Sequence, residues 1–96
     1  MEIIHLTNEN FKDLIKEKVL VDFYANWCGP CKMIVPELER VNSDVKAIKV
    51  DVDEFETLAR EYGVMSIPTL ILFENGQEKK RTIGFIDKDK IETFIK

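Results

Sequence analysis

The hexapeptide Trp27-Cys28-Gly29-Pro30-Cys31-Lys32 constrains this chain more than any other stretch, because it holds both cysteines. An apolar run over residues 19–25, interrupted only by Asp22, precedes it and predicts a buried strand. Apolar residues at helical spacing follow it, so a helix is expected over residues 33–41. The two cysteines therefore stand where a strand leads into a helix, a context that favours redox chemistry.

The spacing of the two cysteines suits a reversible disulfide. Side chains three apart on a helix have Cβ atoms about 5–6 Å apart, and a disulfide needs roughly 3.5–4.5 Å. Pro30 fits the first helical turn, where its missing N–H is not needed, and Gly29 leaves the approach uncrowded. A helix start favours negative charge and therefore the thiolate. We expect Cys28, at the exposed helix start, to be the nucleophile and Cys31, one turn deeper, to be the resolving cysteine.

Two structural interpretations of the cysteine pair are weaker. A disulfide across so short a loop stabilises a fold by only about 2 kcal/mol through chain entropy, and it joins no distant segments. A zinc or iron–sulfur site usually needs four ligands, and beyond the cysteines the chain offers a single histidine, His5. We therefore predict no metal and no bound cofactor.

Length and charge exclude several classes of function. Ninety-six residues suit one domain, so residues 1–96 are expected to fold as a single unit. The net charge of −4 gives no electrostatic reason to expect nucleic-acid binding. No apolar run approaches a membrane span, and no export signal is recognisable at the start. Two cysteines in such a chain indicate a reducing, cytoplasmic location.

The flanking sequence predicts strands and helices in alternation. Residues 2–6 are expected to form an edge strand, in which His5 is incidental. Thr7 or Asn8 is expected to cap the helix that follows. Residues 47–52 alternate between apolar and charged side chains, as a strand does.

The second half of the chain continues this order. Residues 53–56 resemble a capping box, and the helix that they begin is expected to end at Gly63. Residues 70–73 and 79–83 are predicted strands, joined at the hairpin signal Asn75-Gly76. A last helix follows. The order predicts an α/β fold, a sheet covered by helices on both faces.

The hexapeptide on its strand-to-helix junction resembles the thioredoxin family, and the likeness extends over nearly the whole chain. It implies a thioredoxin-like fold with a central five-stranded mixed β-sheet flanked by helices on both faces. It also implies a cis peptide bond before Pro68, which places that proline against the cysteines. The same resemblance implies a groove for a target polypeptide, hydrogen-bonded by the backbone of Ile67. The groove residues that it implies are Trp27, Ser66, Ile67, Ile83 and Gly84.

Asp22 is unusual, because an acid within an apolar strand is rarely buried without a role. The resemblance implies that it accepts and returns a proton behind Cys31. The alternative is a structural ion pair with Lys49, which the family pattern places nearby. Phe85 and Asn26 depart from the residues common at their positions, so they bear on substrate preference.

The resemblance implies a protein-disulfide oxidoreductase that acts mainly as a reductant. The Cys28 thiolate would attack a target disulfide, and Cys31 would then attack Cys28 and release the reduced target. The implied partners of this monomer are disulfide-containing proteins and thioredoxin reductase or an equivalent electron donor. Two other interpretations stay open: an oxidase or isomerase, and a binding module within a larger enzyme.

Overall fold

The computed structural model describes residues 1–8 and 10–96, in which strands and helices alternate along most of the chain. Their order is β1 (Ile3–His5), α1 (Phe11–Leu14), β2 (Val19–Tyr24), α2 (Gly29–Arg40), β3 (Lys46–Asp51), α3 (Glu56–Glu61), β4 (Thr69–Glu74), β5 (Gln77–Ile83) and α4 (Lys88–Phe94).

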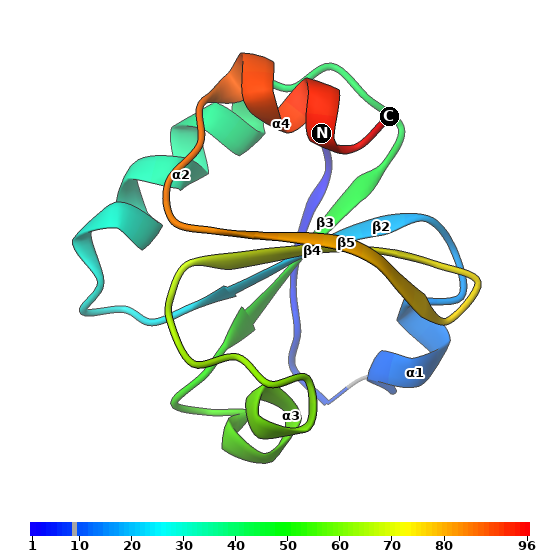
Figure 1. Ribbon diagram of the computed structural model, residues 1–96, viewed down its shortest axis with the longest axis vertical. Helices are drawn as coiled ribbons and strands as arrows, with labels where there is room; N and C mark the ends of the chain where they lie inside the picture. Colours follow the sequence, from blue (N-terminus) through cyan, green and yellow to red (C-terminus); the bar gives the residue numbers. More distant parts are fainter. Residues whose placement is uncertain (9) are drawn as a thin grey trace.

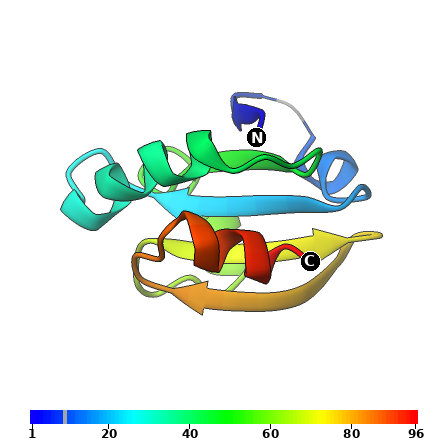
Figure 2. The same ribbon diagram turned by 90° about the horizontal axis from the view of Figure 1, so that it is seen from above.

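The strands form one mixed sheet in the order β1-β3-β2-β4-β5. β1, β3 and β2 run parallel to one another. β4 pairs antiparallel with β2, and β5 pairs antiparallel with β4. Helices α1 and α3 cover one face, and α2 and α4 cover the other (Figures 1 and 2). The predicted five-stranded mixed sheet with helices on both faces is thus confirmed, as is the edge position of the first strand.

β2 is the central strand, and it faces both layers of the core. Side chains alternate across a strand, so Val21 and Phe23 pack toward α1 and α3 while Leu20 packs toward α2 and α4. Asp22 must therefore lie on the same face as Leu20. That is the face covered by α2, the helix that carries Cys31.

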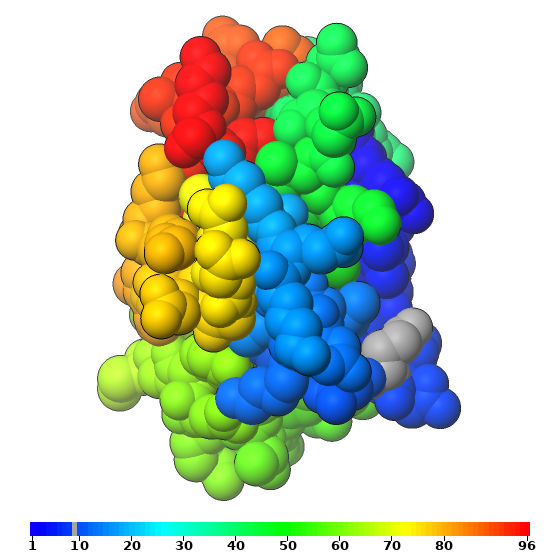
Figure 3. Space-filling view, turned by 90° about the vertical axis from the view of Figure 1, so that its right-hand side faces the viewer, coloured from blue at the N-terminus to red at the C-terminus, as the bar shows by residue number. Residues whose placement is uncertain are grey.

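The tight turns follow the sequence closely. Asn75 and Gly76 both have positive φ, 56° and 78°, as the predicted hairpin requires. Their backbone N–H groups donate to the carbonyls of Lys16 and Ile15, which follow α1. Figure 3 shows the hairpin turn beside this segment. Gly63 also has positive φ, 64°, and closes α3 as expected.

Two predicted helix caps are wrong. The side chain that caps α1 is Asn10, which accepts a hydrogen bond from the Lys12 N–H at 3.0 Å, and neither Thr7 nor Asn8 does so. α3 has no side-chain cap, because it begins at Glu56 and the residue before it is Phe55. Each of the five strands also differs from its predicted bounds by one or two residues at an end, most of all β5, which begins at Gln77.

Within the described part of the chain, no helix combines the length and the apolar character that crossing a membrane requires.

Candidate active site: the cysteine pair and its two sides

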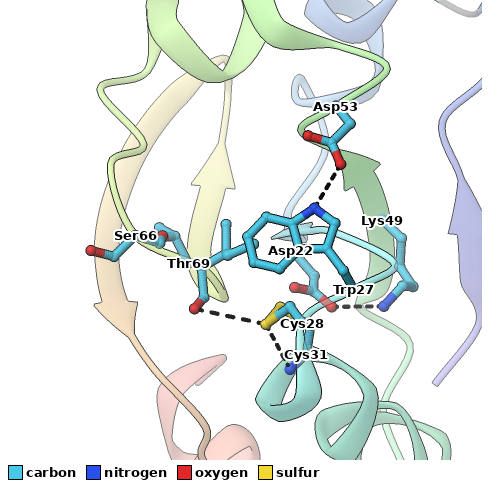
Figure 4. Close-up of a disulfide and its surroundings, with 9 residues drawn as sticks. Asp22, Trp27, Cys28, Cys31, Lys49, Asp53, Ser66 and Thr69 are labelled. Carbon is cyan, nitrogen blue, oxygen red and sulfur yellow. Dashed lines mark hydrogen bonds and ion pairs between the residues drawn. A yellow bond between two sulfur atoms is a disulfide. The ribbon is translucent and has the colours of Figure 1, made fainter.

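Cys28 and Cys31 form a disulfide at the start of α2, with Cα atoms 5.2 Å apart (Figure 4). Cys28 is the N-cap of the helix, and its Sγ accepts a hydrogen bond from the Cys31 N–H at 3.2 Å. Pro30 occupies the first turn, as its missing N–H predicts. The sequence therefore places both sulfur atoms where the unpaired N–H groups of the helix gather.

The expected exposure of Cys28 is wrong. In the disulfide, Cys28 is only 6% exposed and Cys31 only 1%. Ile67 and Val52 pack against the small cluster that the two cysteines form with Ala25. Cys28 is still the more accessible of the two, which agrees with the predicted order of depth.

The loop before β4 forms one wall of the site. The peptide bond between Ile67 and Pro68 is cis, as the resemblance implies, and the carbonyl oxygen of Ile67 lies 4.0 Å from the Cys28 Sγ. The Gly84 N–H donates to the Pro68 carbonyl at 2.8 Å, which ties the end of β5 to this loop. The Ser66 carbonyl accepts a hydrogen bond from the Thr69 hydroxyl, which folds the loop over itself. The structure thus brings the predicted groove residues to one end of the sheet.

Exposed apolar side chains flank this wall. Trp27 is 71% exposed, and Ile83, at the end of β5, is exposed as well. Met65, which the sequence did not single out, is 95% exposed at the start of the loop. Phe85, which departs from the residues common at its position, is also exposed. Large apolar side chains that remain in water near one site are typical of a binding surface.

Asp53, which was predicted to cap a helix, instead accepts a hydrogen bond from Trp27. The indole Nε1–H donates to Asp53 Oδ2 at 2.9 Å, and Figure 4 shows the ring turned toward that acid. Asp51 accepts from the Asp53 N–H at 2.9 Å and from the Asn26 side chain at 3.3 Å. The sequence carried a signal for this contact. Trp27 follows β2 and Asp53 follows β3, and the carboxyl ends of neighbouring parallel strands meet at one edge of a sheet.

Asp22 lies on the buried side of the pair. Its exposed fraction is 0%, and its Oδ2 accepts from Lys49 Nζ at 3.0 Å, a lysine itself only 4% exposed. Among the described residues, Asp22 Oδ1 has no hydrogen-bond partner. Burial raises the pKa of the Asp22 carboxyl above its ordinary value, and the positive charge of Lys49 offsets this only in part.

The two interpretations of Asp22 are therefore compatible. The ion pair with Lys49 exists, yet the carboxyl remains one that holds its proton more tightly than an exposed one. A group with a raised pKa near a dithiol is suited to exchange a proton with it.

Among residues 1–8 and 10–96, no three His, Cys, Asp or Glu side chains gather closely enough to hold a metal ion.

Comparison with known proteins agrees with this geometry. Residues 2–96 match the family model described as Thioredoxin. The thioredoxin of Chlamydia caviae is 48% identical over 91 residues, which cover 91% of this chain and 89% of that protein. The thioredoxin of Staphylococcus saprophyticus is 45% identical over 100 residues, covering 99% and 96%.

Solved structures show the same likeness. A mutant thioredoxin from Halobacterium salinarum superposes with a TM-score of 0.91 at 37% identity, over 98% of this chain and 88% of that one. A chain from a structure on the thiol resolving mechanism in yeast mitochondrial 1-Cys peroxiredoxin via glutathione/thioredoxin systems has a TM-score of 0.84 at 40% identity, over 97% and 92%. With its cysteine pair at disulfide distance, this chain belongs to the thioredoxin family of thiol–disulfide oxidoreductases.

Proposed function

We propose that the chain reduces disulfides in other proteins, with Cys28 as nucleophile and Cys31 as resolving cysteine. The observation that carries this proposal is the asymmetry of the pair. Cys28 Sγ lies beside the Ile67 carbonyl, next to exposed apolar side chains, whereas Cys31 is almost fully buried on the helix that covers Asp22. The outer sulfur is therefore suited to meet a partner, and the inner one to finish the reaction.

The reaction moves two electrons from the dithiol to the target. The Cys28 thiolate attacks one sulfur of the target disulfide, forms a mixed disulfide and displaces one target thiolate. Cys31 then loses its proton and attacks Cys28 Sγ, which displaces the second target thiolate. Each target thiolate takes up a proton, and the chain is left with the Cys28–Cys31 disulfide seen in the structure. A separate reductase returns two electrons to that disulfide.

The groove positions the target chain for this attack. In our proposal an extended segment of the target lies along Ile67 and pairs with its backbone, as an added strand does. In this proposal Pro68 shapes the loop directly after Ile67, which packs against the cysteine cluster, and Trp27 supplies an exposed apolar wall. The other residues assigned to the groove are Ser66, Ile83 and Gly84, while Gly29 and Pro30 shape the turn between the two sulfur atoms.

Asp22 acts on the second step, as acceptor of the Cys31 proton. Its position on the face covered by α2 and its raised pKa both support this role. Lys49 is secondary: its ammonium favours the carboxylate form of Asp22 and so limits how far that pKa rises.

The partners follow from the chemistry. They are proteins that contain an accessible disulfide, and thioredoxin reductase or an equivalent donor. The similarity to a chain studied with a 1-Cys peroxiredoxin supports redox partners of this kind. We also propose that residues 1–96 act as one monomeric domain in a reducing compartment such as the cytoplasm, because both cysteines belong to the redox pair.

An insulin-reduction assay with a candidate reductase and its electron source tests the proposal directly. The wild-type chain should catalyse many turnovers, and Cys28→Ser should catalyse none. Cys31→Ser should accumulate a mixed disulfide with the target, because nothing then resolves it. Equal trapping by Cys28→Ser and Cys31→Ser would contradict the assigned order of attack. Absence of turnover with intact cysteines and a working reductase would contradict the reductant role.

A further inference from the structure

The ammonium of Lys49 has two partners on β2. Its Nζ donates to Asp22 Oδ2 at 3.0 Å, a contact drawn in Figure 4, and it also lies 4.2 Å from the centroid of the Tyr24 ring. A cation within about 6 Å of an aromatic ring, over its face, is attracted by the electrons of that face. Lys49 is therefore held both by a carboxylate and by a ring.

The register of the sheet explains why these three side chains meet. Lys49 of β3 pairs with Asp22, and Tyr24 stands two residues farther along β2. Side chains two apart on a strand point to the same face, and the contacts place Lys49 on that face too. This is the face that α2 covers. The charge network of Asp22 is thus continued by an aromatic side chain.

Lys49 has an alternative position available. Long lysine side chains usually carry their charged end to water. Tyr24 and Lys49 line a pocket of about 190 Å³ together with Asn26 and Lys32, which are exposed. Lys49 nevertheless stays 4% exposed. The Tyr24 ring stands where it can keep the ammonium on Asp22 instead of letting it turn into this pocket.

The Tyr24 ring is suited to hold a cation over the whole neutral range. Burial, followed by the negative charges of Asp51, Asp22 and Glu54, raises the pKa of the Tyr24 phenol, so the phenol stays uncharged. The ring is half-buried and packs against the cluster that contains both cysteines. Its position is therefore set by the same packing that sets the cysteine pair.

The place of the ammonium decides the protonation of Asp22. Burial raises the pKa of this carboxyl, and the charge of Lys49, followed by its hydrogen bond, opposes the rise. If the ammonium moved away, burial would act unopposed and the carboxyl would hold its proton to higher pH. A protonated carboxyl cannot accept a further proton from Cys31.

We propose that Tyr24 is a positioning residue for the resolving step: the face of its ring holds the Lys49 ammonium on Asp22 and so keeps Asp22 ready to accept the Cys31 proton. The inference rests on the proposed role of Asp22. Tyr24 does not touch the reacting sulfur in this role and acts through Lys49. The ring is what matters, and the phenolic hydroxyl is dispensable.

The neighbouring elements offer few other charges to Asp22. Among the described residues, Lys49 is the one that donates a hydrogen bond to its carboxyl. β4 pairs Leu70 with Asp22, and α4 adds apolar side chains to this layer. The titratable groups around the Asp22–Lys49 pair are His5 of β1, which pairs with Lys49, Tyr24 of β2, and Cys31 and Lys32 of α2.

Four variants of the full-length protein test the role of the ring. Tyr24→Leu removes the ring, and Tyr24→Phe keeps it without the hydroxyl. Lys49→Met removes the ammonium, and the double variant Tyr24→Leu, Lys49→Met removes both. Val52→Ala is the matched control, because Val52 packs against the same cysteine cluster and has no ring.

Two measurements are made on each variant. The titration of Asp22 is followed through the ¹³C shift of its carboxyl carbon in the oxidised protein, in which neither cysteine titrates. The resolving step is followed by rapid acid quench during a single turnover with a disulfide target, across pH 5–9.

Lys49→Met should raise the Asp22 midpoint by roughly 1–3 pH units, the range that a nearby opposite charge produces. Tyr24→Leu should raise it by about one pH unit, because the ammonium is then held on Asp22 for only part of the time. Tyr24→Phe and Val52→Ala should keep the midpoint near the wild-type value. The pH profile of the resolving step should move with the midpoint in each case.

The double variant separates positioning from packing. If Tyr24 acts through Lys49, Tyr24→Leu should cause no further rise in the Lys49→Met background, because no ammonium is left to hold. An equal rise in both backgrounds would overturn the inference, as would a wild-type midpoint in Tyr24→Leu. A rise in Tyr24→Phe as large as in Tyr24→Leu would also overturn it, since the hydroxyl would then be the group that matters.

The proposed function fails in a different way. If Asp22→Asn resolves the mixed disulfide as fast as wild type, Asp22 is not the acceptor, whatever the Tyr24 variants do to its midpoint. If Asp22→Asn is slow but the resolving profile of Tyr24→Leu stays in place while its midpoint rises, Asp22 keeps its role and the inference about Tyr24 is wrong.

Discussion

The two sides of the cysteine pair offer opposite surroundings to adjacent sulfur atoms. On the front side, Trp27 and Met65 expose large apolar surfaces, and the Ile67 carbonyl lies beside Cys28. On the rear side, Asp22 and Lys49 form a buried ion pair. The front resembles a binding surface, and the rear resembles the interior of an acid–base site. One cysteine pair can therefore serve both the attack on the target and the resolving step, because each sulfur has its own environment.

Removing the rear carboxylate should have the largest effect on the resolving step. Asp22→Asn should slow resolution by roughly 100-fold, the lower end of what a positioned acid–base group contributes. The first attack, by Cys28, should change little. Rapid-quench measurement of the mixed disulfide separates the two steps. If the variant resolves the mixed disulfide as fast as wild type, the buried side does not act as an acid–base site.

The same substitution should stabilise the fold at neutral pH. The folded-state pKa of Asp22 is raised, so between the ordinary value near 3.9 and the folded value the folded state binds more protons than the unfolded state. The contribution of Asp22 to stability is therefore fully present below about pH 3.9 and is lost as the pH rises through the folded pKa. Asn removes the buried charge, and its carbonyl can still accept from Lys49.

Denaturant titrations of wild type and Asp22→Asn at several pH values test this sign. The difference in free energy of unfolding should grow from pH 4 toward neutral pH, in favour of the variant. A variant that is less stable at neutral pH would show that the ion pair with Lys49 outweighs the cost of burial.

Truncating the exposed indole tests the front side. Trp27→Ala should lower kcat/KM for a protein target about tenfold, because an exposed aromatic anchor typically contributes more than about 1 kcal/mol to binding. The rate of resolution within a preformed mixed disulfide should stay the same. Slower resolution in this variant would show that the two sides are coupled and would weaken the comparison.

Loosening the same side chain without removing it should have the smallest effect. Asp53→Ala removes the acceptor of the Trp27 indole N–H, and a hydrogen bond of this kind contributes about 0.5–1.5 kcal/mol. Target kcat/KM should fall about threefold. Glu54→Ala is the matched control, because it removes a neighbouring carboxylate in the same turn and leaves Asp53, the acceptor of the indole N–H, in place. Equal losses in both variants would assign the effect to the loop rather than to the indole.

The sequence was sufficient for the fold and the cysteine pair, because both depend on patterns that only one arrangement satisfies. An apolar strand followed by Cys28, Pro30 and Cys31 allows few geometries, and Asn75-Gly76 allows one kind of turn. The family assignment and the mixed sheet were confirmed for the same reason. Features that depend on local spacing alone and have one solution are thus readable in advance.

The errors occurred where several residues could satisfy the same local rule. Thr7, Asn8 and Asn10 can all cap a helix, and packing of Phe11 against the rings of Tyr62 and Phe73 is what places the helix start. Asp53 fits a capping box by spacing, but the pairing of β2 with β3 brings it to the Trp27 indole instead. Such choices depend on contacts distant in sequence.

The hydrogen bond from the Cys31 N–H to the Cys28 Sγ has a consequence for the motion of the helix. A thiolate accepts such a bond more strongly than a disulfide sulfur does, because it carries a full charge. The first turn of α2 stabilises the thiolate, and by thermodynamic linkage the thiolate stabilises the first turn by the same free energy. Local opening of the first turn and ionisation of Cys28 are therefore coupled. A partner that unwinds the turn would also lower the fraction of Cys28 present as thiolate.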